Sequence, residues 1–149
     1  MEGYNMKLTD KIHLLKLDFT INLNLNKKIE RFVNCIIIFG KKITLIDTGT
    51  KNNSEYIFSY IKENGRDISE VETVILSHSH PDHIGSAAEI KKTTGCRILA
   101  HDEEKSWIEN IEIQNKERPV PNFFDLANKS VKIDTFLEDG QEIRTDENI

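Results

Sequence analysis

The sequence contains few cysteines, prolines and aromatic residues. Among its 149 residues, 2 are Cys, 3 are Pro and 7% are aromatic. Two cysteines without C-x-x-C spacing exclude a disulfide framework and a cysteine-based zinc or redox motif. Cys35 and Cys96 lie in or beside short apolar segments, so both are expected to be buried strand thiols.

Long apolar runs and an excess of one charge are also lacking. The longest apolar run, residues 35–39, is far too short to cross a bilayer. The N-terminus has no apolar stretch of signal-peptide length, which predicts a cytoplasmic protein without membrane contact. The net charge is −5 and the lysine pairs are isolated, so a broad nucleic-acid footprint is not expected.

What the sequence does contain is a regular succession of strand and helix patterns. The length supports a single domain over residues 1–149. Apolar periodicity and Gly or Pro boundaries place the elements. The expected order is strands over 11–19, 21–26, 33–39 and 43–46, a helix capped by Asn53 or Ser54 and stopped by Gly65, a strand over 71–76, a helix from Pro81 to Gly95, a strand over 97–100 and a helix over 102–110.

The β-α-β-α-β order between residues 43 and 100 predicts parallel strands joined by right-handed crossovers. Ligands gather at the carboxyl ends of such strands, and three polar segments lie there, at 47–50, 77–83 and 101–102. Further along, the pattern weakens. It predicts a loop with a small apolar anchor within 111–130, a strand over 131–136 and the start of another over 142–144.

Three histidines and an aspartate occur within six residues, His78-Ser79-His80-Pro81-Asp82-His83. Imidazole and carboxylate are ligands that zinc accepts at neutral pH. Two residues apart in extended backbone, the first two histidines point the same way. The proline then turns the chain, so that the aspartate and last histidine begin a helix and face the same cavity. This clustering favours a metal-binding loop over a polar capping loop with incidental histidines.

The motif and its surroundings resemble the N-terminal half of the metallo-β-lactamase superfamily. The resemblance runs from about Val33 to Ala100 and recurs loosely at Leu137-Glu-Asp-Gly. It implies an α/β fold, namely half of an αββα sandwich with a mixed β-sheet and helices on one face. The matching segments are Leu45-Ile-Asp-Thr-Gly, Val74-Ile-Leu and His78-Ser-His-Pro-Asp-His-Ile-Gly.

The resemblance also implies a metal centre with one or two Zn²⁺ ions, two in the complete fold. By the family's pattern, His78 and His80 bind the first ion, and Asp82 and His83 the second. Asp82 is also the expected catalytic residue, because it would orient the attacking water. Asp47 would steady the site without binding metal, its alternative role being a turn-forming aspartate before Thr-Gly.

The implied reaction is hydrolysis of an ester, thioester, lactone or similar bond in a small-molecule substrate by metal-activated water. A true β-lactamase is disfavoured, because the chain shows no export signal. Iron-containing relatives that reduce oxygen typically carry Glu where this chain has His80, which favours zinc. Two alternatives stay open: a truncated, non-catalytic metal-binding or partner-binding module, and a nuclease of the same superfamily, against which the acidic balance argues.

Part of the family pattern is missing. The complete fold supplies a third histidine to the first metal, a bridging aspartate and a last histidine from a second half. The chain is therefore expected to be an N-terminal portion, truncated before the third ligand histidine and weak or inactive alone. His101, after the next parallel strand, is the substitute ligand considered, and His13 is expected at the surface. Either the missing half or a second copy of the chain is expected to cover the exposed sheet face.

Overall fold

The computed structural model describes residues 5–144. One seven-stranded mixed sheet follows the order of the chain, antiparallel from β1 to β4 and parallel from β4 to β7. The strands are β1 (Asn5–Lys7), β2 (Ile12–Asn24), β3 (Lys27–Phe39), β4 (Ile43–Ile46), β5 (Val71–Ile75), β6 (Arg97–His101) and β7 (Thr135–Leu137).

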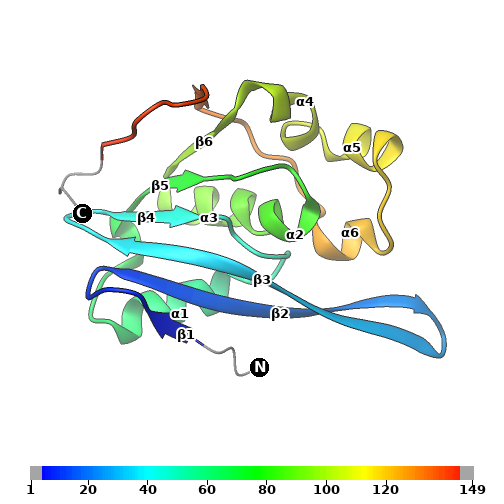
Figure 1. The fold of residues 1–149 in the computed structure, drawn as a ribbon, viewed down its shortest axis with the longest axis horizontal. Helices are drawn as coiled ribbons and strands as arrows, with labels where there is room; N and C mark the ends of the chain where they lie inside the picture. Colours follow the sequence, from blue (N-terminus) through cyan, green and yellow to red (C-terminus); the bar gives the residue numbers. More distant parts are fainter. Residues whose placement is uncertain (1–4, 145–149) are drawn as a thin grey trace.

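Helices connect the parallel strands, and in Figure 1 α1 and α3 lie behind the sheet, on one face of it. This arrangement confirms the predicted α/β class and the β-α-β-α-β order. The α-helices are α1 (Ser54–Glu63), α2 (Pro81–Ile84), α3 (Ala87–Thr94), α4 (Lys105–Ile108), α5 (Ile111–Glu117) and α6 (Phe123–Leu126), and the 3₁₀ helices are η1 (Ile68–Glu70) and η2 (Asp102–Glu104).

Strands β2 and β3 form one long hairpin whose distal half projects beyond the rest of the sheet (Figure 1). The predicted strands over 11–19 and 21–26 are therefore one continuous strand. In the proximal half, alternate side chains such as Leu15, Leu17 and Cys35 are buried toward the helices, as period-two alternation requires. In the distal half, pairing continues without a core, and Leu25 is 100% exposed.

His13 was expected at the surface, and this prediction was wrong. The residue occupies a helix-facing position of β2 and is only 2% exposed. Its Nδ1 lies 2.7 Å from the Tyr60 hydroxyl of α1, and its ring packs edge-on against Phe39 at 4.8 Å. The apolar alternation of β2 carries this imidazole into the core, where the Asp10 carbonyl oxygen lies 3.2 Å from Nε2. Both ring nitrogens therefore have partners, as burial requires.

The helix predicted from Pro81 to Gly95 is in fact two helices, α2 and α3. The break falls at Gly85 and Ser86, because the backbone there bonds to the loop after β4 instead of continuing the helix. The Gly85 N–H donates to the Gly49 carbonyl oxygen at 2.8 Å, and the Ser86 hydroxyl donates to the Thr50 carbonyl oxygen at 2.6 Å. The break thereby ties the loop after β4 to the loop after β5.

The region after β6 differs most from expectation. The helix predicted over 102–110 is divided into η2 and α4, and the loop predicted within 111–130 contains α5 and α6. The strand predicted over 131–136 is only three residues long, β7, and residues 142–144 form no regular element. Both cysteines are buried and free, as predicted.

The helix-free face of the sheet carries an apolar group of half-buried side chains: Ile12, Leu14, Ile36, Ile38, Ile46 and Ile75. What covers this face, a second half or a second copy, stays a prediction. Within residues 5–144, no helix combines the length and apolar character needed to cross a membrane.

Gly85 generates a stability prediction. A Cβ at this position would lie 2.4 Å from the backbone atoms Leu126 O, Lys51 N and Thr50 C, none of which can move alone. Gly85→Ala should therefore lower the free energy of unfolding by about 3 kcal/mol or more, measured by urea denaturation. Gly95→Ala is the control. That site has φ of +72° but nothing within 4 Å, so only the left-handed backbone penalty of about 1–2 kcal/mol applies. Equal losses for the two variants would contradict the proposed close approach.

Candidate metal centre

The histidine loop leaves the sheet at the carboxyl end of β5. The Leu76 N–H still bonds to the Leu99 carbonyl oxygen. The chain then bends at Ser77 and continues without regular structure to His80, whose φ and ψ are −55° and 142°. Pro81 takes the first position of α2, where its missing N–H costs nothing. Between Ser77 and Pro81 burial alternates along the chain: Ser79 is 0% exposed, whereas His78 is half-buried and His80 is exposed, both on the solvent side.

The three imidazoles of the loop form one cluster. The centroids of the His78 and His80 rings are 4.8 Å apart, and those of His78 and His83 are 4.0 Å apart. His78 Nε2 lies 3.1 Å from His80 Nδ1, so a ring nitrogen of each histidine faces the same point. On the other side of His83, its Nε2 lies 3.7 Å from Asp82 Oδ2. The structure thus brings together the four predicted ligand residues.

Asp47, at the end of β4, contacts the loop through Ser77 and His83. Its Oδ1 accepts a hydrogen bond from the Ser77 N–H at 2.8 Å, and its Oδ2 accepts one from the Ser77 hydroxyl at 2.6 Å. His83 Nδ1 lies 2.9 Å from the same Oδ2. The residue is 6% exposed and has a φ of 64°, a left-handed conformation that aspartate tolerates better than most residues. Asp47 thus turns the chain and hydrogen-bonds the loop, and its role beside a metal ion stays a prediction.

The pKa values of His78 and His83 are shifted in opposite directions. Burial lowers the pKa of His78 below its ordinary value, and the neighbouring His83 and His80 lower it further. Burial acts in the same sense on His83, but the hydrogen bond and negative charge of Asp47, together with the charge of Asp82, outweigh it and raise the pKa of His83. A His83 ring that donates from Nδ1 to Asp47 presents its Nε2 lone pair toward Asp82, which is the form that binds metals.

The donor atoms fit metal ions as two pairs. Two nitrogens bound to one tetrahedral zinc at about 2.0–2.1 Å lie roughly 3.3 Å apart, close to the 3.1 Å between His78 and His80. The 3.7 Å between Asp82 and His83 is similar. Within residues 5–144, no three His, Cys, Asp or Glu side chains are arranged together as a ligand set for one ion. Each pair would thus need further donors to complete its coordination.

His101, the predicted substitute ligand, is used differently. Its Nδ1 accepts a hydrogen bond from the Glu103 N–H at 3.1 Å and so caps η2. In the described part of the chain, no contact joins it to the histidine cluster, and its role as a ligand stays a prediction.

Three residues near the loop were missed from the sequence. Ser77 bonds to Asp47, and its hydroxyl also lies 2.9 Å from His78 Nδ1. Gln114 and Arg118, on and just after α5, contact Ser79. No motif marks Gln114 and Arg118, because the sequence predicts a loop over 111–130, and nothing distinguishes Ser77 from its polar neighbours within 77–83.

The fold and the loop together define the class: a mixed α/β sheet with a histidine-rich loop at the carboxyl end of a parallel strand. The sequence also matches the family described as the metallo-beta-lactamase superfamily over residues 29–146. The chain therefore belongs to this superfamily.

Curated relatives match shorter stretches of sequence. A "probable metallo-hydrolase" of Methanocaldococcus jannaschii is 30% identical over 77 residues, covering 52% of this chain and 36% of the relative. A metal-dependent hydrolase of Pyrococcus abyssi is 35% identical over 63 residues, covering 42% of this chain and 26% of the relative. A hydroxyacylglutathione hydrolase of Nitrobacter hamburgensis is 37% identical over 41 residues, covering 28% and 16%.

Solved structures support the fold over nearly the whole chain. The subclass B3 metallo-beta-lactamase BJP-1 of Bradyrhizobium japonicum superposes with a TM-score of 0.70 at 23% identity, covering 95% of this chain and 47% of that structure. A beta-lactamase from Chitinophaga pinensis superposes with a TM-score of 0.72 at 17% identity, covering 95% of this chain and 48% of that structure. The chain thus spans about half the length of these structures.

The opposite pKa shifts of the two histidines can be measured. In metal-free protein, NMR titration of the ring protons should place the pKa of His83 above about 6.5 and that of His78 below it. Asp47→Asn should lower the pKa of His83, because the negative charge is lost while burial remains. A His83 pKa at or below that of His78 in the wild type would contradict the Asp47 contact.

The same shift predicts a dependence of stability on pH. Because the folded-state pKa of His83 is raised, its contact with Asp47 stabilises the fold fully below about pH 6.5, and this contribution is lost as the pH rises through the raised value. The difference in free energy of unfolding between wild type and Asp47→Asn should therefore be larger at pH 6 than at pH 8.

Proposed function

We propose that this chain carries part of the active site of a zinc-dependent hydrolase. The observation that supports it best is the pair of ring nitrogens, His78 Nε2 and His80 Nδ1, facing one another at 3.1 Å on the solvent side of a loop whose base is fixed by Asp47. If the histidines were incidental to a polar capping loop, their imidazoles would have no reason to gather on its solvent side. The family and the metal-dependent relatives support the same proposal.

The residues divide the chemistry among themselves. When bound, zinc would supply Lewis-acid activation of a water molecule and of the attacked carbonyl oxygen. His78 and His80 would hold one ion, and Asp82 with His83 the other. The Asp82 carboxylate would also accept a hydrogen bond from the attacking water and so orient it toward the substrate. Asp47 would keep the His83 ring in the tautomer that binds metal.

The surroundings of the loop favour substrates with an apolar group. A cavity of about 190 Å³ adjoins the loop, and His80 and Asp82 form part of its wall. Its other walls are mostly apolar. They include Phe19 and Ile21 of β2, Phe32 of β3, Val120 and Leu126. An ester, thioester or lactone with a small hydrocarbon group would fill this cavity while its carbonyl lies at the loop.

A non-catalytic metal-binding module is the second candidate. It is favoured by one observation, that no third donor completes either ligand pair within the described residues. Catalytic zinc normally has three protein ligands. Metal binding without turnover would support this candidate over the hydrolase.

Metal binding can be tested directly. Equilibrium dialysis against zinc with elemental analysis should show binding to the wild type and at least about tenfold weaker binding to the His78→Ala/His80→Ala variant. His101→Ala is the matched control, expected to bind as the wild type does because its Nδ1 bonds to Glu103. Unchanged zinc content in the double variant would mean that the loop is not the site, and a loss in the control would make His101 a ligand.

Hydrolysis is the further test. The zinc-loaded protein should hydrolyse a butyrate ester slowly, because neither ligand pair has a third donor within residues 5–144. Asp82→Asn should lower this rate by about 100-fold or more, because the water loses its orienting carboxylate. Asp125→Asn, an exposed aspartate of α6, serves as control and should keep wild-type activity. If Asp82→Asn is as active as the wild type, the role given to Asp82 is wrong.

A further inference from the structure

Two side chains from the region of α5 bind the residue between the first two histidines. Gln114 Nε2 donates to the Ser79 carbonyl oxygen at 2.6 Å, and Arg118 Nη2 donates to the Ser79 hydroxyl at 2.5 Å. Gln114 and Ser79 are both 0% exposed. The backbone and the side chain of Ser79 are therefore each fixed from the protein side, between the half-buried His78 and the exposed His80.

These contacts affect the two histidines because side-chain burial alternates along residues 78–80. Because Ser79 points inward while His78 and His80 point outward, any rotation of the backbone at Ser79 swings the two imidazoles relative to each other. The 3.1 Å spacing of their ring nitrogens thus depends on how firmly Ser79 is held. Asp47 fixes the two ends of the loop, through Ser77 and His83, and does not contact its middle.

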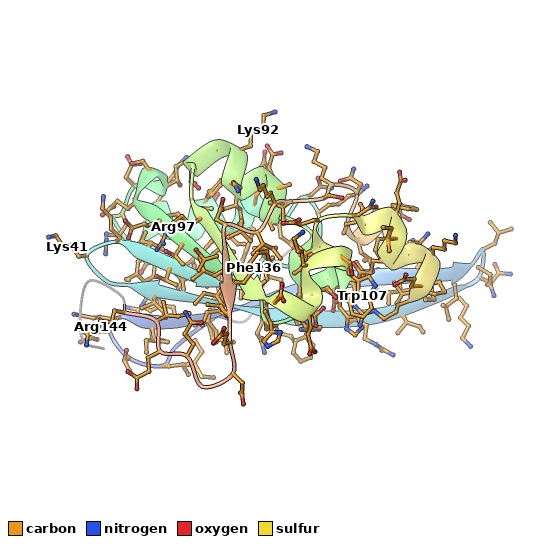
Figure 2. The ribbon with its side chains drawn as sticks, turned by 90° about the horizontal axis from the view of Figure 1, so that it is seen from above. Lys41, Lys92, Arg97, Trp107, Phe136 and Arg144 are labelled. Atoms are coloured by element: carbon orange, nitrogen blue, oxygen red, sulfur yellow. The ribbon has the colours of Figure 1, made fainter. Side chains whose placement is uncertain are left out.

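Arg118 also contacts an aromatic side chain. Its guanidinium lies over the Trp107 ring, 3.7 Å from the centroid, and the Trp107 indole N–H donates to Glu117 Oε2 at 2.7 Å. Trp107 belongs to α4, and Figure 2 shows it at the α4–α5 end of the molecule, away from Lys41 in the β3–β4 turn. Helices α4 and α5 thereby form a stack that presents a fixed guanidinium to the loop.

Packing alone does not explain a glutamine and an arginine here. Gln114 Oε1 and Arg118 Nε are buried and have no hydrogen-bond partner within the described residues. Leaving such atoms unpaired costs free energy, so apolar side chains of similar size would pack more favourably. What the two polar side chains add is their contact with Ser79.

We propose that Gln114 and Arg118 are positioning residues of the metal centre, which set the spacing of His78 and His80 by fixing Ser79 between them. The proposal rests on the proposed function, since the spacing matters only if these histidines bind a metal ion. Residues that orient metal ligands typically change metal affinity by 10–100-fold when replaced.

The experiment measures Co²⁺ binding by dialysis and by the visible absorption of the bound ion. Arg118→Met should weaken Co²⁺ binding by about tenfold or more and change the absorption spectrum, whereas Arg118→Lys, which keeps one donor, should recover part of the loss. Ser79→Ala should act similarly. The Ser79→Ala/Arg118→Met double variant should bind no more weakly than the worse single variant, because both remove the same contact.

Arg66→Met is the matched control. Arg66 also donates to a backbone carbonyl oxygen, that of Gly40 at 2.7 Å, and its guanidinium lies 5.9 Å from the centroid of an aromatic ring, that of Phe39, but it does not touch the loop. Its replacement should lower the melting temperature without altering Co²⁺ affinity or spectrum. Wild-type affinity and spectrum in Arg118→Met, or the same loss in Arg66→Met, would overturn the proposal.

A readout without metal separates this proposal from the proposed function. In metal-free protein, the ¹⁵N resonances of the His78 and His80 rings should report one shared proton in the wild type and its loss in Arg118→Met. If the wild type takes up no Co²⁺, the proposed metal function fails. If the ring resonances are the same in wild type and Arg118→Met, the positioning role fails, whatever the metal result.

Discussion

The candidate site depends on one buried carboxylate, that of Asp47. The two carboxylate oxygens of Asp47 accept three hydrogen bonds, two from Ser77 and one from His83, and both of these residues lie in the histidine loop, residues 77–83. A single charge at the end of β4 therefore shapes the loop after β5. A buried carboxylate is tolerated only when it is well bonded, and here the bonds that satisfy it are also those that build the site. Stability and chemistry therefore share the same interactions, and neither can be altered at Asp47 without the other.

The parallel sheet explains why these segments meet. Strands β4 and β5 are parallel, with Leu45 opposite Val74 and Ile46 opposite Ile75, which brings the ends of both strands to the same edge. The loops then contact through glycine backbones that leave no room for a Cβ, as at Gly85. Helix α3 begins only after this contact, so the site is assembled by the connections between elements rather than by the elements themselves.

The sequence predicted the framework well where local pattern and chain order agree. The presence of β2, the hairpin at Gly40 and the run from β4 to β6 follow from apolar spacing and turn residues. The histidine loop was found because its residue types are rare and clustered. Prediction from the sequence failed where long-range contacts determine the structure. Nothing local to β2 indicates that His13 contacts Tyr60. Nothing in the segment after β6 indicates that Gln114 and Arg118 contact Ser79. A helix break imposed by hydrogen bonds to a distant loop, as at Ser86, is invisible for the same reason.

The long hairpin of β2 and β3 has a consequence for how binding preferences can evolve. Its outer half supplies one wall of the cavity beside the loop yet contributes little to the buried core, as the fully exposed Leu25 shows. A hydrogen bond from the Asn22 N–H to Asn122 Oδ1, at 2.6 Å, joins it to the segment before α6. Substitutions and length changes in this arm can therefore reshape the cavity at small cost to folding. The cavity wall to which the proposed function assigns substrate contact is in this way separated from the part that keeps the protein folded.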